Sequence, residues 1–380
     1  MKRMRQIRGI LQASLFSVLF AVGGCDSPPP EQQTPNLCAP DTPASPSCKP
    51  FSGPLSSCKC SNEDYAPRYS GSKNDTWPSC ISDADPNKYV QLGTSTSAAS
   101  RTKAFQSMGA LLWKKGTPPT ATDFTQARDS YAVDQGIGSR VARRQDIHYP
   151  EVPGSDKFAC STASVAAQYP DRCAGPGKLK PIIDQAFVDG IAGNKPRVQA
   201  ARIEAALLWF FYLSTLSEEW TSSFDNMSDV DSACGYLVGG VDRSSPLGLG
   251  EYIRQLDTET YDRAFDGVLA GRCWRDFDKA LPATCGAFYS RVNAQLDKAL
   301  QRGLALILRD RLSRISGLSG EEQEAAIAFV NVFGGLLDRA VRALDATKAD
   351  QLKTTTQATA LANMNISQAQ GILDTLFACP

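Results

Sequence analysis

Apolar residues recur at helical spacing along most of the chain beyond residue 95. Behind Ser319, the apolar positions Ile327, Val330, Gly334, Leu337, Val341 and Leu344 alternate in steps of three and four, the seam of antiparallel helix packing. The alternation typical of strands is never sustained for more than a few residues. We therefore predict an all-α fold, a largely antiparallel helical bundle. The expected helices cover Ser95–Lys115, Thr122–Gln145, Pro196–Trp220, Asp229–Gly240, Pro246–Leu256, Thr258–Phe277, Thr284–Ile315, the segment behind Ser319 through Leu344, and Ala362–Leu376.

Three segments refine this picture. Ala205–Leu213 is apolar all round, and a helix of that kind is surrounded by other helices, so we expect it at the bundle centre. Asp146–Lys178 is rich in proline and glycine, which predicts a loop with one short helix near Ser161–Gln168. Ser319 with Glu322 fits a capping box at the start of a helix.

The first 25 residues have the composition of an export signal. Four basic residues precede the apolar stretch Ile10–Val22, which is shorter than the roughly 20 residues of a spanning helix. The stretch ends in Val22-Gly23-Gly24-Cys25, which resembles the lipobox of bacterial lipoproteins. The resemblance implies cleavage before Cys25, fatty acylation of Cys25, and an extracytoplasmic protein anchored to a bacterial membrane through lipid.

Composition divides the chain into four parts. After a signal peptide at 1–24, the segment 25–57 holds nine prolines and predicts a disordered tether that begins at the lipidated cysteine. Residues 58–91 form a small cysteine-rich segment that depends on disulfides, and 92–380 form the helical domain. The 40 basic and 40 acidic residues balance, so nothing in the charge indicates a nucleic-acid partner.

Twelve cysteines in a chain with an export signal favour disulfides. Short loops and helix geometry predict the late pairs Cys160–Cys173 and Cys273–Cys285, the second stapling a helix hairpin that turns at Leu281-Pro282. The remaining late pair, Cys234–Cys379, would tie the C-terminus to the middle of the bundle. In the early set, we expect Cys58 and Cys60 to pair with Cys80 and Cys48, which leaves Cys38 over.

The single histidine of the chain, His148, limits the chemistry available. With Glu151 it forms an HxxE sequence, which resembles the GxHxxE motif of the imelysin family, although Asp146 stands where that motif has glycine. The resemblance implies a helical extracytoplasmic protein in which His148 and Glu151 bind a metal. The alternative from the residues themselves is a solvated histidine in a loop, because Pro150 breaks a helix there.

A second candidate is the glycine-rich stretch Gly239–Gly250, directly before a predicted helix. Asp242, Arg243 and Ser244 lie in it, and backbone amides together with Arg243 offer a binding site for an anion. If a ligand site exists, we expect this loop to line it, with Arg243 and Asp242 as the side chains that point inward. A tight connection between two helices explains the same sequence without a ligand.

The leading functional hypothesis is a cell-envelope lipoprotein that binds a partner or acts as a scaffold. No cofactor is predicted, and the expected partners are membrane lipid through Cys25 and an unidentified partner in the envelope. One alternative is a carboxylate-dependent enzyme acting on envelope polysaccharide, since paired carboxylates cleave glycosidic bonds without histidine. The other is a metal-binding protein of the imelysin kind.

Overall fold

A computed structural model describes residues 89, 91, 97–153, 159–220, 227–280 and 282–377, without the side chains of 220, 227, 228, 270 and 272–291. The predicted signal peptide, lipobox, tether and early cysteines lie outside the described residues.

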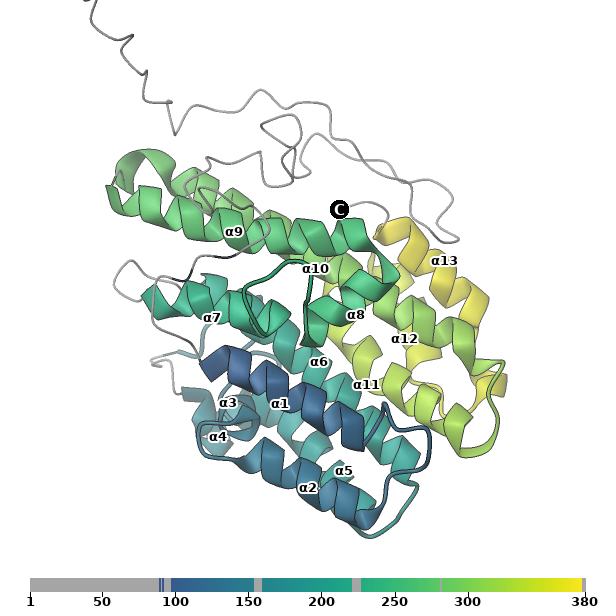
Figure 1. The fold of residues 1–380 in the computed structure, drawn as a ribbon. Helices are drawn as coiled ribbons and strands as arrows, with labels where there is room; N and C mark the ends of the chain where they lie inside the picture. Colours follow the sequence, from purple (N-terminus) through teal and green to yellow (C-terminus); the bar gives the residue numbers. More distant parts are fainter. Residues whose placement is uncertain are drawn as a thin grey trace, which may run out of the picture. The chain divides into compact units, whose positions relative to one another are not determined.

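The described part of the chain consists of α-helices, short helical turns and connections, and has no strand (Figure 1). This confirms the predicted all-α fold. The helices are α1 (Ser97–Leu111), α2 (Ala121–Ala132), α3 (Ile137–Val141), α4 (Ala163–Gln168), α5 (Lys180–Ile191), α6 (Pro196–Trp220), α7 (Met227–Val238), α8 (Gly248–Leu256), α9 (Thr258–Ala280), α10 (Pro282–Ile315), α11 (Gly320–Leu344), α12 (Ala346–Thr356) and α13 (Ile366–Leu376).

Helix α6 forms the centre of the bundle. It packs against α5, α7, α8, α10 and α11, and Figure 1 shows it between the group of α1 and α7 and the group of α11 and α12. Every residue of Ala205–Leu213 is buried, and Phe210 and Phe211 are fully enclosed. The prediction that this segment lies at the bundle centre is confirmed, and the all-round apolar pattern is its cause.

Pairs of consecutive helices form hairpins around α6. The longest pair, α9 and α10, runs side by side (Figure 1), and α9 ends at Ala280 and α10 begins at Pro282, in agreement with the hairpin predicted from Leu281-Pro282. Along α10 the apolar positions Val292, Leu296, Leu300 and Leu304 are all buried. The seam of α11 is buried from Ile327 to Val341, whereas its last predicted position, Leu344, is 58% exposed.

The predicted helix Thr122–Gln145 is wrong in its second half. The chain leaves the helix at Val133, Gln135 takes a positive φ of 55°, and a short α3 follows. The reason is a contact from another helix, because Arg101 of α1 donates from Nε and Nη2 to the carbonyl oxygen of Gln135 at 2.9 and 2.7 Å. The carbonyl oxygens of Gln135 and Gly136 thus accept hydrogen bonds from a guanidinium and not from the amides of a continuing helix.

Three further features differ from the sequence-based expectation. Helices α5 and α12 were not predicted: a π-helical turn at Gly175–Leu179 leads directly into α5, and Asp345 caps α12 by accepting from the Lys348 amide at 3.0 Å. The predicted helix Ala362–Leu376 begins only at Ile366, after a 3₁₀ turn. Ser319 is the N-cap of α11 as expected, but its hydroxyl makes no capping hydrogen bond.

Candidate functional site

His148, a candidate site residue from the sequence, lies at the centre of a cluster of polar side chains. It lies in the connection between α3 and α4, and its two ring nitrogens each meet a carboxylate. Nδ1 donates to Asp146 Oδ1 at 2.7 Å and Nε2 donates to Asp297 Oδ2 at 2.8 Å. Asp297 comes from α10, and its other oxygen accepts from the Tyr212 hydroxyl of α6 at 2.7 Å. The cluster therefore holds this loop against α6 and α10.

Electrostatics keep this imidazole protonated. Burial on its own lowers the pKa of His148, but the hydrogen bonds and charges of Asp146 and Asp297 outweigh it and raise the pKa to about 9. Burial likewise favours a raised pKa for Asp297, yet the hydrogen bond and charge of His148, with the Tyr212 hydroxyl, hold that pKa below its ordinary value. At neutral pH, His148 is thus an imidazolium that donates from both nitrogens.

The two residues of the predicted metal pair, His148 and Glu151, do not lie on a helix. Residues 145–153 form turns rather than a helix, so no helical face aligns the two side chains. Glu151 is exposed, and its charge acts on Arg172. Across the described residues, no group of three His, Cys, Asp or Glu side chains is placed to hold a metal ion.

The loop around His148 is fixed by further contacts. Arg172 donates from Nη1 to the carbonyl oxygens of Asp146 at 3.2 Å and Tyr149 at 2.8 Å. The Lys178 ammonium lies over two aromatic rings, 5.9 Å from the centroid of Tyr149 and 5.8 Å from that of Trp209. Cation–π contacts of this kind stabilise the position of a charged group, so the cluster is ordered from three sides.

The glycine-rich stretch Gly239–Gly250 connects α7 to the first turn of α8, and the side chain of Arg243 within it is buried. Its guanidinium does not face an open site: Nη1 contacts Asp262 Oδ1 at 3.0 Å and Nη2 contacts Asp266, both on α9. The ring of Phe265 lies 4.5 Å from the guanidinium carbon. Asp242 and Ser244, the other candidate residues, are exposed. These contacts favour the tight interhelical connection over an anion site at this loop.

Of the three predicted late disulfides, one is confirmed, one is wrong, and the third, Cys273–Cys285, lies outside the described side chains. Cys160–Cys173 is confirmed, with an S–S length of 1.99 Å, and the two cysteines form a small satellite core with Val152 and Ala166. The pair Cys234–Cys379 is wrong, because Cys234 is a buried free thiol that donates to the Gly240 carbonyl at 3.7 Å.

The physical reason lies in the arrangement of helices. Cys234 belongs to α7, which packs against α1, α6, α8 and α9, whereas α13, just before Cys379, packs against α10 and α12. Cys379 lies outside the described residues, as do the side chains of Cys273 and Cys285.

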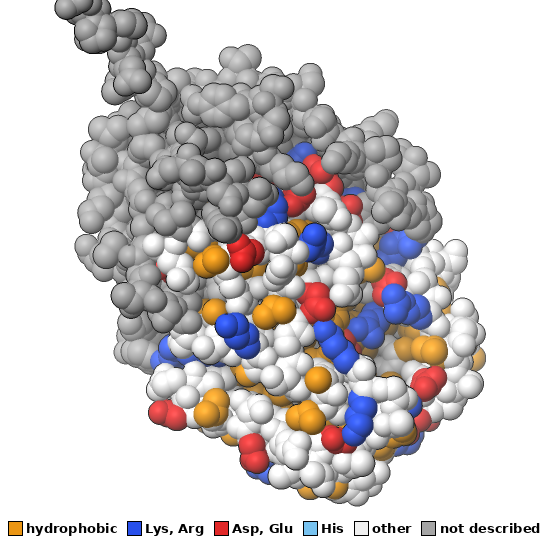
Figure 2. Space-filling view, in the orientation of Figure 1, with side chains coloured by type: hydrophobic (Ala, Val, Ile, Leu, Met, Phe, Trp, Pro, Cys, Tyr) orange, Lys and Arg blue, Asp and Glu red, His pale blue; other side chains and the backbone are white. Residues whose placement is uncertain are grey.

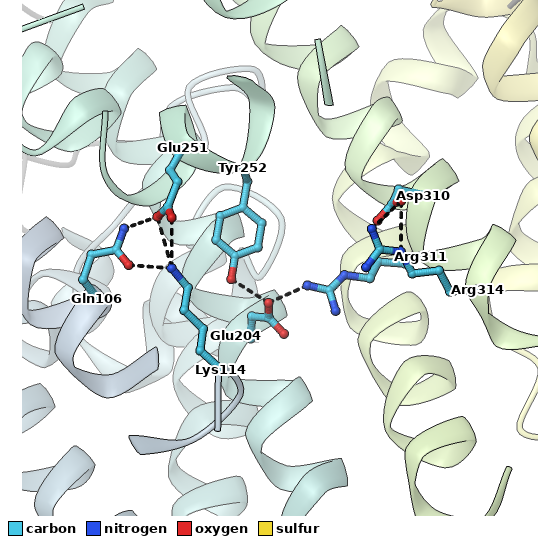
Figure 3. A network of polar contacts seen from close by, with 8 residues as sticks. All are labelled: Gln106, Lys114, Glu204, Glu251, Tyr252, Asp310, Arg311 and Arg314. Atoms are coloured by element: carbon cyan, nitrogen blue, oxygen red, sulfur yellow. Dashed lines mark hydrogen bonds and ion pairs between the residues drawn. The ribbon is translucent and has the colours of Figure 1, made fainter. Parts of the chain in front are cut away.

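A further polar network, shown in Figure 3, was not predicted from the sequence. Glu204 of α6 is buried beneath it, and its Oε1 accepts from the Tyr252 hydroxyl of α8 and from Arg311 Nη2 of α10, each at 2.6 Å. Beside it, Glu251 of α8 pairs with Lys114 at 3.1 Å. The sequence signal was a lone carboxylate directly before the apolar segment Ala205–Leu213, a position that requires a buried partner.

Burial and charge act in opposite directions in this network. Burial lowers the pKa of Arg311, but the neighbouring Glu204 carboxylate more than offsets it and the pKa is raised. Burial and the charge of Glu204 both raise the pKa of Tyr252 well above its usual value. The Arg311 guanidinium also lies 4.3 Å from the Phe329 ring centroid on α11. The buried carboxylate thereby links α6, α8 and α10, Arg311 extends the contact to α11, and the charge of Glu204 is balanced within the network.

None of the described helices combines the length and the apolar character that crossing a membrane requires. Comparison of the chain with protein-family models, with curated proteins and with solved structures gives no match.

Proposed function

We propose that this chain is a lipid-anchored cell-envelope protein whose helical body binds or scaffolds a partner at the membrane surface. The observation that carries the proposal is the sequence Val22-Gly23-Gly24-Cys25 at the end of the apolar stretch Ile10–Val22. Two acyl chains on one cysteine supply enough buried methylenes, at about 0.8 kcal/mol each, for stable anchoring. The nine prolines that follow would hold the body away from the lipid as an extended spacer.

The contacts inside the helical body support a binding or scaffolding role. His148 with Asp297 and Glu204 with Arg311 form ion pairs between segments 149 and 107 residues apart, and Arg243 with Asp262 holds the α7–α8 connection to α9. Figure 2 shows charged side chains of both signs interspersed over the described part of one face, with hydrophobic side chains in small separate areas. A rigid body with such a surface is suited to polar or mixed contacts with another macromolecule.

Mass spectrometry of the N-terminal peptide tests the anchor. We expect the chain purified from membranes to begin at Cys25 with the added mass of acyl chains, and Cys25→Ser to leave the protein unprocessed. A mature chain that begins elsewhere, or an unmodified Cys25, would contradict the proposal.

Two assays on the detergent-solubilised full chain separate binding from catalysis. In the first, the protein is incubated with purified peptidoglycan, and released fragments are measured against a heat-unfolded control. Reproducible release supports the polysaccharide enzyme and overturns the binding role. In the second, we look for envelope components that co-purify in a fixed ratio with the folded chain and not with the unfolded control. Such components support the binding role.

A further inference from the structure

Two arginines, Arg101 and Arg144, converge around Tyr236 of α7, apart from the clusters described above. Arg101 of α1 donates from Nη1 to the Tyr236 hydroxyl at 3.0 Å, and its guanidinium carbon lies 5.9 Å from the ring centroid. The guanidinium carbon of Arg144 lies 5.6 Å from the same centroid. Arg140 is added to them because α3, which carries it, begins directly after Gly136, whose carbonyl oxygen accepts from Arg101 Nε at 3.4 Å, and ends shortly before Arg144. The charge of Arg140, with that of Arg144, acts on Arg101.

The burial of this cluster makes its charge costly. Arg101 is 4% exposed and Arg144 is 8% exposed. Burial lowers the pKa of Arg101; the hydroxyl of Tyr236 opposes this, and the charges of Arg140 and Arg144 lower the pKa further. An arginine remains charged in proteins even so. Three positive charges therefore repel one another in a partly dehydrated place, which is stable only with compensating negative charge.

The described residues supply one such charge. Glu218 of α6 accepts from Arg144 Nη2 at 2.8 Å and thus balances Arg144. The acceptors of Arg101 are neutral, namely the Tyr236 hydroxyl and the carbonyl oxygens of Gln135 and Gly136. Two guanidinium charges, those of Arg101 and Arg140, are left without a carboxylate.

Unused donors point to the same place. In the part of the chain that the structure describes, the Nε atoms of Arg140 and Arg144 are both buried and have no hydrogen-bond partner. Arg140 also has no ion-pair partner there, although buried guanidinium donors are normally satisfied. The side chain of Arg140 is only half-buried and that of Glu218 is 19% exposed, so these two side chains border solvent at the edge of the cluster.

We propose that Arg101, Arg140 and Arg144 form a binding site for a phosphate group. A phosphate monoester or inorganic phosphate carries close to two negative charges at neutral pH, which matches the two unbalanced guanidinium charges. Guanidinium donors bind its oxygens through short charge-assisted hydrogen bonds. The site would use Arg140 from α3, Arg144 from the following turn and Arg101 from α1, with Glu218 keeping Nη2 of Arg144 occupied.

Isothermal titration calorimetry of the full chain with inorganic phosphate tests the site, and a second titration with glycerol 3-phosphate distinguishes free phosphate from an organic phosphate. The variant Arg140→Gln removes the guanidinium that lacks a partner. We expect it to weaken phosphate binding by about tenfold or more, because a hydrogen bond to a charged group is lost. The matched control is Arg128→Gln, at an exposed arginine of α2, which should leave the affinity unchanged.

The thermal stability of the same variants separates a ligand site from a structural contact. In phosphate-free buffer, Arg140→Gln should melt at the same temperature as the wild type or higher, because it removes an unbalanced charge. Added phosphate should raise the melting temperature of the wild type and of Arg128→Gln, but much less that of Arg140→Gln. Absence of phosphate binding by the wild type at millimolar concentration, or equal affinity in Arg140→Gln, would overturn the proposal.

Discussion

The clamp of Asp146, His148 and Asp297 predicts how stability depends on pH. The pKa of His148 is about 9 in the folded chain, against an ordinary value of 6.5. A group whose pKa rises on folding contributes its full stabilisation below the unfolded pKa and loses it as pH rises through the folded pKa. The contribution of His148 is therefore complete below pH 6.5, declines between 6.5 and 9, and is absent above 9.

The size of the effect follows from the same two values. At 1.36 kcal/mol for each pKa unit, the step from 6.5 to 9 corresponds to about 3 kcal/mol of unfolding free energy. We would measure urea unfolding of the wild type and of His148→Gln at one pH below 6.5 and one above 9. The difference between the two proteins should be larger by about 3 kcal/mol at the lower pH.

A matched variant and a direct titration make this prediction refutable. Glu151→Gln changes an exposed carboxylate in the same loop. The difference in unfolding free energy between this variant and the wild type should change little between the two pH values. Because His148 is the single histidine of the chain, its imidazole NMR signals need no assignment and report the pKa directly. A midpoint near 6.5, or a stability difference that stays constant across the two pH values, would refute the reasoning.

Three substitutions test other parts of the fold by urea unfolding. Replacing both Cys160 and Cys173 by serine should cost about 3 kcal/mol, since the bridge spans 13 residues; no loss would contradict a role for the bridge in stability. Arg243→Met should cost about 3–5 kcal/mol by leaving two buried aspartates without its guanidinium; a loss below about 1 kcal/mol would point away from a structural ion pair. Phe210→Ala should cost about 3–5 kcal/mol at a fully buried site, against nearly nothing for exposed Val188→Ala.

Local patterns were sufficient where one helix carried its own signal. Pro196 and the all-round apolar run predicted both the limits and the central place of α6, because a helix with no polar face must be enclosed. The α9–α10 hairpin followed from Leu281-Pro282 in the same way, since proline starts a helix readily and interrupts one in progress. These elements depend on residues close together in the sequence.

The candidate sites could not be predicted because their partners are distant. Asp297 is 149 residues from His148, and one carboxylate among 40 acidic residues has no local mark that selects it. The same holds for Arg101 of α1, whose guanidinium binds the carbonyl oxygen of Gln135 just beyond the end of α2. Arg243 is buried, but whether its guanidinium contacts a ligand or two aspartates depends on how α9 packs, which helical periodicity does not specify.

The buried thiol of Cys234 has a consequence for how this protein meets oxidants. Burial and the nearby carboxylates of Asp231 and Glu219 raise its pKa well above the usual value, so almost none of it is the reactive thiolate. Packing shields the thiol only as long as α7 stays in place against α6. The rate at which an alkylating reagent modifies Cys234, followed on its own tryptic peptide, therefore measures how often α7 opens.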